Sequence, residues 1–141
     1  MIVLEIEGEG LMLQSGAYIA SESGVSFDTS WGGSKGFFGS GSLLLLRVSG
    51  QGTLLAGCYG ALEERILKPG ERYTVDTGHI VAFDPSIGFQ VRRVGSWKST
   101  LLGGEGLVCE LTGPGRALMQ SRSEEAFLNW LLPKLPQRSN N

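Results

Sequence analysis

Residues 97–115 read Trp-Lys-Ser-Thr-Leu-Leu-Gly-Gly-Glu-Gly-Leu-Val-Cys-Glu-Leu-Thr-Gly-Pro-Gly, and residues 34–52 carry a similar pattern earlier in the chain. A shift of 63 positions, from Lys35 to Lys98, aligns the two stretches without a gap, and a shift of 62 extends the match upstream. Self-similarity at a fixed spacing is typical of proteins built from repeated units. We therefore predict one β domain over residues 1–141, made of two tandem repeats at about 11–58 and about 73–121.

The identical residues of the two repeats are mostly glycines and small or apolar residues. They pair Gly41, Leu44, Gly50, Gly52 and Leu55 with Gly104, Leu107, Gly113, Gly115 and Leu118, and Gly16, Ala20 and Phe27 with Gly78, Ala82 and Phe89. The 22 glycines of the chain have no three-residue period and lie between short apolar runs, which indicates tight turns between strands. The sequence therefore predicts an all-β fold.

Two local patterns refine this prediction. Residues 43–48, Leu-Leu-Leu-Leu-Arg-Val, form a run that is apolar except for Arg47, which is typical of a strand covered on both faces. In residues 67–71, Leu-Lys-Pro-Gly-Glu, proline and glycine stand at the second and third positions of a turn, which predicts a type II turn.

The C-terminal segment departs from the strand pattern. Ser123 and two acidic residues resemble a helix start, Phe127, Trp130 and Leu131 follow at helical spacing, and Pro133 blocks continuation. We predict one short helix at about 124–132 and expect it to pack on the sheet. The alternative is that its apolar side chains, Trp130 and Leu128 among them, meet a partner subunit or a membrane surface.

Composition and charge argue against several functions. The formal net charge of −2 is unlike the basic excess of nucleic-acid-binding proteins. Cys58 and Cys109 lie far apart without Cys-x-x-Cys spacing, which predicts reduced, buried thiols in a cytoplasmic protein. Because His79 is the single histidine, we predict no metal site and no cofactor.

No catalytic constellation is evident. Residues 32–36 fit the Gly-x-Ser-x-Gly nucleophile elbow, but no helix pattern follows them, so a structural glycine loop is favoured. His79 with Asp76 offers a weaker enzyme hypothesis, because no nucleophile stands beside them in the pattern. Glu22 and Asp84 occupy equivalent places in the two repeats, and each is embedded in turn-forming residues, so loop formation is their expected role.

Lys35 and Lys98 form a symmetric pair beside the two largest glycine-rich loops. Backbone N–H groups of such loops bind anions in some proteins, although these loops lead into strands instead of helices. Trp31 and Trp97 are the nearby aromatic residues. We name these four residues as a speculative site for a small ligand or an anion between subunits; the alternative is that both lysines are solvated on exposed loops.

Six motifs of this chain resemble the altered-inheritance-of-mitochondria family, which shares the tryptophan RNA-binding attenuator protein-like fold. They are residues 16–21 (Gly-Ala-Tyr-Ile-Ala-Ser), 57–60 (Gly-Cys-Tyr-Gly), 67–71, 75–83 (Val-Asp-Thr-Gly-His-Ile-Val-Ala-Phe), 103–107 (Gly-Gly-Glu-Gly-Leu) and 113–115 (Gly-Pro-Gly). The resemblance implies a double-stranded β-helix or β-sandwich and matches the C-terminal half of longer relatives. It supplies no catalytic residues, and the attenuator protein's tryptophan and RNA binding do not transfer with a fold alone.

The function predicted from these observations is a non-enzymatic, oligomer-forming β-domain that acts as a scaffold or interaction module. The alternative is the small-ligand or anion-binding protein with its site at the glycine-rich loops. The apolar run at 43–46 and the apolar residues of the helix would expose large patches on a monomer, so we expect a homo-oligomer, dimer through hexamer. Nucleic acid is not an expected partner, and no motif supports membrane association.

Overall fold

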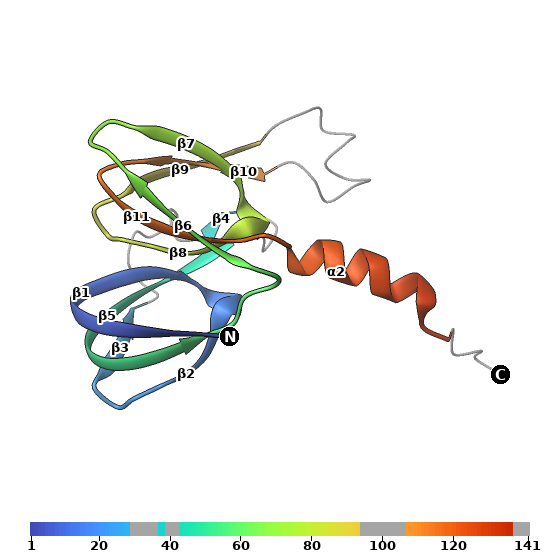
Figure 1. The fold of residues 1–141 in the computed structure, drawn as a ribbon, viewed down its shortest axis with the longest axis horizontal. Coiled ribbons are helices and arrows are strands. Elements are labelled where there is room, and N and C mark those ends of the chain that lie inside the picture. Colours follow the sequence, from blue (N-terminus) through green and yellow to red (C-terminus); the bar gives the residue numbers. More distant parts are fainter. Residues whose placement is uncertain (29–36, 39–42, 94–106, 137–141) are drawn as a thin grey trace.

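The computed structural model describes residues 1–28, 37–38, 43–93 and 107–136 (Figure 1). Its strands, in chain order, are β1 (Ile2–Gln14), β2 (Tyr18–Ser21), β3 (Val25–Asp28), β4 (Phe37–Phe38), β5 (Leu43–Ala56), β6 (Leu62–Leu67), β7 (Arg72–Asp76), β8 (Ile80–Phe83), β9 (Gly88–Arg93), β10 (Leu107–Thr112) and β11 (Gly115–Gln120). Single 3-10 turns precede β2 and β8 as η1 (Ser15–Ala17) and η3 (Thr77–His79), and the helix α2 (Glu124–Leu131) runs into η4 (Leu132–Lys134). The prediction of an all-β fold with one short C-terminal helix is confirmed.

The strands form two antiparallel sheets. The larger has the order β2-β5-β1-β8-β11-β6, with β3 and β4 also paired to β5, and the smaller has the order β7-β10-β9. We call the strands β1 to β5 the first half and β6 to β11 the second half. In Figure 1 the strands β1, β2, β3 and β5 lie below and β6 to β11 lie above, and the pairing of β1 with β8 joins the two halves. The long strands β1 and β5 therefore each take part in more than one pairing.

Glycines allow β1 to follow β5 along its whole length. The register between them shifts between Gly8 and Leu11, and both Gly8 and Gly10 have positive φ, at 61° and 64°. A bulge of this kind bends a strand and increases its twist. The equivalent chain segment in the second half is divided into the separate strands β6 and β7.

Strand pairing in the first half recurs in the second half at the shifts of 62 and 63 residues. Leu11 lies opposite Val48 as Tyr73 lies opposite Leu111, and Tyr18 lies opposite Ala56 as Ile80 lies opposite Met119. The pairing of β3 with β5 has the same counterpart, since Phe27 lies opposite Val48 and Phe89 opposite Leu111. The two halves thus share their register as well as their strand order.

The halves meet at a short seam, where β1 pairs antiparallel with β8. Met12 lies opposite Phe83 and Leu13 opposite Ala82, and all four side chains are buried. Two hydrophobic clusters fill the interior, and each takes residues from both halves. The first-half cluster includes Val81, Ala82 and Leu118, and the second-half cluster includes Met12, Leu43 and Leu45.

Two local predictions can be compared directly with the structure. The N–H of Glu71 donates to the carbonyl of Lys68 at 2.9 Å and Gly70 has φ of 76°, which confirms the type II turn. The run at 43–48 differs from the prediction, because Leu43 and Leu45 are buried whereas Leu44 and Leu46 are only half-buried. Alternate side chains of a strand point to opposite faces, and the second face of β5 is therefore only partly covered.

The helix begins as predicted, but the expectation that it packs on the sheet is wrong. The Ser123 hydroxyl accepts the N–H of Ala126 at 3.1 Å, which caps the first turn. Beyond that turn α2 projects away from the sheets (Figure 1), and Leu131 is the only one of its described side chains that is even half-buried. The ring centroids of Phe127 and Tyr59 lie 6.2 Å apart, so α2 contacts the β domain near its N-terminal end.

Candidate interaction site

The predicted ligand site lies outside the described residues. This applies to Lys35, Lys98, Trp31 and Trp97, and also to the glycine loop at 32–36. The small-ligand or anion site at these positions therefore stays a prediction.

His79 and Asp76 both serve the local structure of η3. The Nδ1 atom of His79 lies 2.7 Å from the carbonyl oxygen of Gln120, and because a carbonyl only accepts, Nδ1 carries the proton. The carboxylate of Asp76 accepts the N–H of Gly78 at 2.8 Å. Gln120 in turn donates to the carbonyl of Gly78 and accepts the N–H of Tyr59, each at 2.9 Å. These contacts join η3 to β11 and build no catalytic pair.

Glu22 and Asp84 close equivalent loops in the two halves. The carboxylate of Glu22 accepts the N–H of Thr53 at 2.7 Å, and that of Asp84 accepts the N–H of Arg116 at 2.7 Å. Thr53 and Arg116 themselves correspond at the shift of 63. The carboxylates fix the chain directly after two positive-φ residues, Gly52 and Gly115, so their role is structural, as the turn chemistry predicts.

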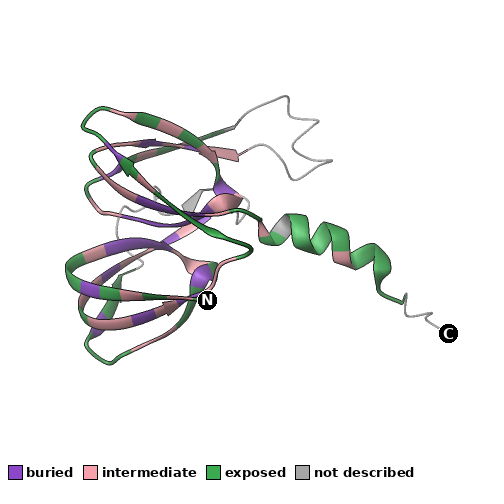
Figure 2. Ribbon diagram, in the orientation of Figure 1, coloured by how far each residue is buried: buried purple, intermediate pink, exposed green. Residues whose placement is uncertain are grey.

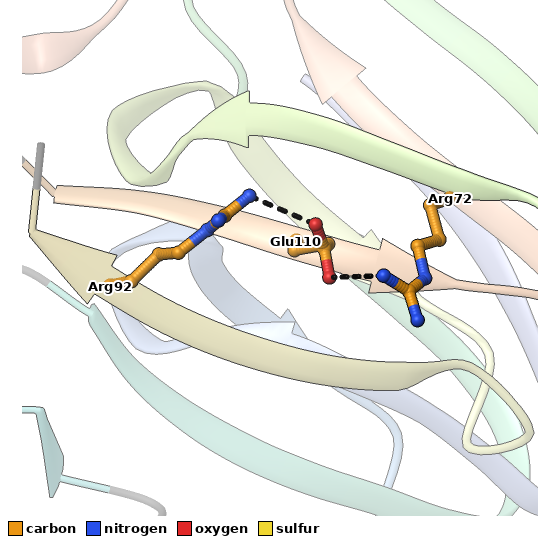
Figure 3. Close-up of polar contacts among 3 residues, drawn as sticks. All are labelled: Arg72, Arg92 and Glu110. Carbon is orange, nitrogen blue, oxygen red and sulfur yellow. Dashed lines mark hydrogen bonds and ion pairs between the residues drawn. The ribbon is translucent and has the colours of Figure 1, made fainter.

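The outer face of the three-stranded sheet is polar and internally neutralised (Figure 3). Glu110 on the central strand β10 lies 2.9 Å from the guanidinium of Arg92 on β9 and 3.8 Å from that of Arg72 on β7. Both arginines are more than half exposed, so these ion pairs contribute little to stability. The face is solvated, and the carboxylate of Glu110 is already paired with two arginines.

The helix α2 presents an exposed apolar surface. Its large exposed side chains, with those of η4 and the residue that follows, are Phe127, Leu128, Trp130, Leu132 and Leu135. Trp130 is 60% exposed, and the Nζ atom of Lys134 lies 5.1 Å from the centroid of its ring. Contiguous apolar patches of this kind are uncommon on monomeric proteins and mark interaction sites. Helical spacing in the sequence predicts these residues, but only the structure shows that the sheet leaves them uncovered.

A second set of incompletely covered residues lies on β2 and β7, which stand at the ends of their sheets. On β2, Tyr18 and Ile19 are exposed, and on β7, Tyr73 and Val75 are half-buried. The sequence predicts neither strand as a candidate surface. A lack of charge in residues 18–21 is the one signal it offered, because exposed sheet edges usually carry charged side chains.

Other site chemistry is limited in the part of the chain that the structure describes. No cluster of three His, Cys, Asp or Glu side chains there could hold a metal ion. None of the described helices is long and apolar enough to cross a membrane. Both cysteines are unpaired, and burial raises the pKa of the Cys109 thiol to about 12, so this thiol stays protonated.

Comparison with known proteins gives consistent matches. The model of the family described as Mitochondrial biogenesis AIM24 matches residues 1–122. The chain is similar to an uncharacterised protein of Streptococcus pyogenes serotype M6, M6_Spy0233, with 28% identity over 142 residues, 99% of this chain and 57% of that protein. It is also similar to the crystal structure of protein SPYM3_0169 from Streptococcus pyogenes, with a TM-score of 0.77 and 25% identity over 95% of this chain and 59% of that one. The chain thus spans less than three fifths of the length of these relatives.

Proposed function

Because this chain belongs to the Mitochondrial biogenesis AIM24 family and its matched relative is uncharacterised, we propose its function from its own surface. We propose a non-enzymatic β-domain that forms homo-oligomers and acts as a scaffold or interaction module. The observation that carries this proposal is the helix α2, which extends away from both sheets and is exposed along most of its length (Figure 2), its large apolar residues included.

A second copy of the chain is the partner that the charges of this helix favour. Glu124 stands at its start and Lys134 shortly after its end. If two copies of α2 approach antiparallel, each acidic start lies beside the basic end of its neighbour, and the two helix dipoles oppose one another favourably. The same surface then contacts itself, as in a closed two-fold dimer.

The organisation and location of the chain are part of the same proposal. We propose that its halves are two tandem repeats of one unit, supported by the strand registers that recur at shifts of 62 and 63 residues. We also propose a reducing, cytoplasmic location, which the unpaired Cys58 and Cys109 support.

Light scattering after size-exclusion chromatography tests the proposed function. At micromolar concentration we expect a mass that is a multiple of the 15.1 kDa chain. Trp130→Glu places a charge on the apolar surface and should weaken the association about tenfold or more, which corresponds to roughly 1.4 kcal/mol or more. A wild-type mass of 15.1 kDa that does not change with concentration would refute the proposal.

Ile66→Glu is the matched control. Ile66 is 63% exposed, close to the 60% of Trp130, but it lies on β6 opposite Arg116, where a glutamate gains a cross-strand partner. We expect this variant to keep the wild-type mass. If both variants dissociate equally, any added acidic charge disrupts the oligomer and α2 has no special role.

A further inference from the structure

The pairing of β1 with β8 at the seam covers apolar residues in the middle of the molecule. The equivalent strands are β7, which corresponds to β1, and β2, which corresponds to β8, and neither has such a cover. A shift of 62 residues places the seam residues Met12 and Leu13 on Thr74 and Val75 of β7. The same shift places Ala82 and Phe83 of β8 on Ala20 and Ser21 of β2. Among the described strands, β10 is the one partner of β7 and β5 the one partner of β2.

Burial shows what the seam contributes. Val81 of β8 is 0% exposed, because it packs into the first-half cluster, whereas its counterpart Ile19 on β2 is 50% exposed. On the other side of the seam, Leu13 is buried in that cluster, whereas its counterpart Val75 is only half-buried. Both strands of the seam therefore have an equivalent at a sheet edge, β2 for β8 and β7 for β1, and the apolar residues of these equivalents are less buried.

We propose that β2 of one copy pairs antiparallel with β7 of a second copy, repeating the seam between molecules. The register of the seam transfers directly, so Ser21 lies opposite Thr74 and Ala20 opposite Val75 of the neighbouring copy. This inference rests on the proposed function, since it names a second contact, besides that of α2, through which the scaffold assembles. It is carried by the strand edges and is independent of α2.

The side chains at this contact are compatible. Ser and Thr form favourable cross-strand pairs through their hydroxyls, and Ala opposite Val leaves no buried polar group. Residues 18–21 and 73–75 carry no charge. The edge strand β6 differs, because it exposes Glu63 and Glu64, and charged side chains protect sheet edges from pairing with another chain.

The contact joins unlike surfaces, so it is heterologous. Each copy offers one β2 edge and one β7 edge, and a copy bound through β2 still presents its own β7. Such contacts build a ring if the rotation between copies closes, and a filament if it does not. The number of copies then follows from the angle between the two halves of one chain, because that angle is repeated at every contact.

Directed disulfide formation tests the register. In a Cys58→Ser background, which removes the more accessible native thiol, Ser21→Cys and Thr74→Cys are made as separate proteins and mixed under mild oxidation. Directly opposed residues of antiparallel strands have Cα atoms about 4.5–5.5 Å apart, which lies within the range for a disulfide. We expect a cross-linked dimer of twice the 15.1 kDa chain mass that contains one copy of each variant, resolved by mass spectrometry.

Ser26→Cys mixed with Thr74→Cys is the matched control, because Ser26 is an exposed serine on β3, away from the proposed contact. This mixture should cross-link much less than the test mixture, by about tenfold or more, because only the test pair is expected to have disulfide geometry. Equal yields from the two mixtures, or only symmetric dimers of each variant, would overturn the β2–β7 contact.

The two proposals fail separately. A wild-type oligomer without the mixed disulfide refutes the β2–β7 contact and leaves the scaffold function standing. A wild-type protein that stays at 15.1 kDa refutes both.

Discussion

Two glycines at the bulge of β1 permit a comparison in which backbone conformation is held constant and only the available space differs. Gly8 and Gly10 have nearly the same φ, 61° and 64°. An added Cβ at Gly8 meets nothing within 4 Å, whereas one at Gly10 would overlap the carbonyl oxygen of Val48. Gly8→Ala and Gly10→Ala therefore incur the same left-handed strain, but only the second must also displace β5.

The expected magnitudes follow from these two contributions. Left-handed backbone costs an alanine about 1–2 kcal/mol, and the reduced freedom of the unfolded chain offsets about 0.4–1 kcal/mol of this, so Gly8→Ala should destabilise by roughly 1 kcal/mol. Overpacking against a well-ordered strand adds about 1–3 kcal/mol for Gly10→Ala. Val48 is fully buried and lies opposite Leu11, so β5 has little room to yield.

Urea denaturation followed by far-ultraviolet circular dichroism measures the difference. We expect Gly10→Ala to lower the free energy of unfolding by about 1–3 kcal/mol more than Gly8→Ala. The m value, the slope of this free energy against urea concentration, should not change. Equal losses in the two variants, within about 0.5 kcal/mol, would show that the Val48 carbonyl moves freely and that the bulge is not tightly packed.

Three further predictions test the core, a turn and a thiol. Phe83→Ala at the seam should destabilise the protein by about 3–5 kcal/mol in the same urea assay, and a loss under 1 kcal/mol would mean that Phe83 is not part of a packed core. The hydrogen bond from the Lys68 N–H, aided by Arg65, lowers the pKa of Glu71 in the folded protein. The ionised Glu71 therefore stabilises the fold above the unfolded pKa of 4.5, and this stabilisation is lost as pH falls through the lowered folded pKa. Glu71→Gln should remove that part of the acid dependence of stability, and a variant with the wild-type pH profile would contradict this prediction. Because burial raises the pKa of Cys109 to about 12, a thiol reagent at pH 8 should modify no more than one cysteine in the folded protein, and rapid modification of both would show that Cys109 is accessible.

Local structure was predictable from sequence wherever neighbouring residues determine it. The type II turn at Gly70 and the Ser123 helix cap depend on residues no more than three positions away, and both form as predicted. Strand identity also follows from local pattern and spacing. The placement of α2 does not, because an apolar helix of this length satisfies the same pattern whether or not a sheet lies beneath it.

The difference between β2 and β8 shows where sequence reasoning ends. Residues 18–20 read Tyr-Ile-Ala and residues 80–82 read Ile-Val-Ala, and both runs predict a strand. One is exposed and the other buried because β1 reaches β8 and no described strand reaches the outer edge of β2. That contact joins residues about 70 positions apart, and propensity and periodicity carry no information about contacts at such separations.

The sharing of the two hydrophobic clusters has a consequence for how the molecule unfolds. Met12, Leu43 and Leu45 complete the interior of the second half, while Val81, Ala82 and Leu118 complete that of the first. If one half unfolds, buried apolar side chains of the other half become exposed to solvent. The two halves should therefore unfold in one cooperative transition instead of two. Amide hydrogens of β5 and β11 should then exchange at similar rates, limited by global opening, even though the strands belong to different halves.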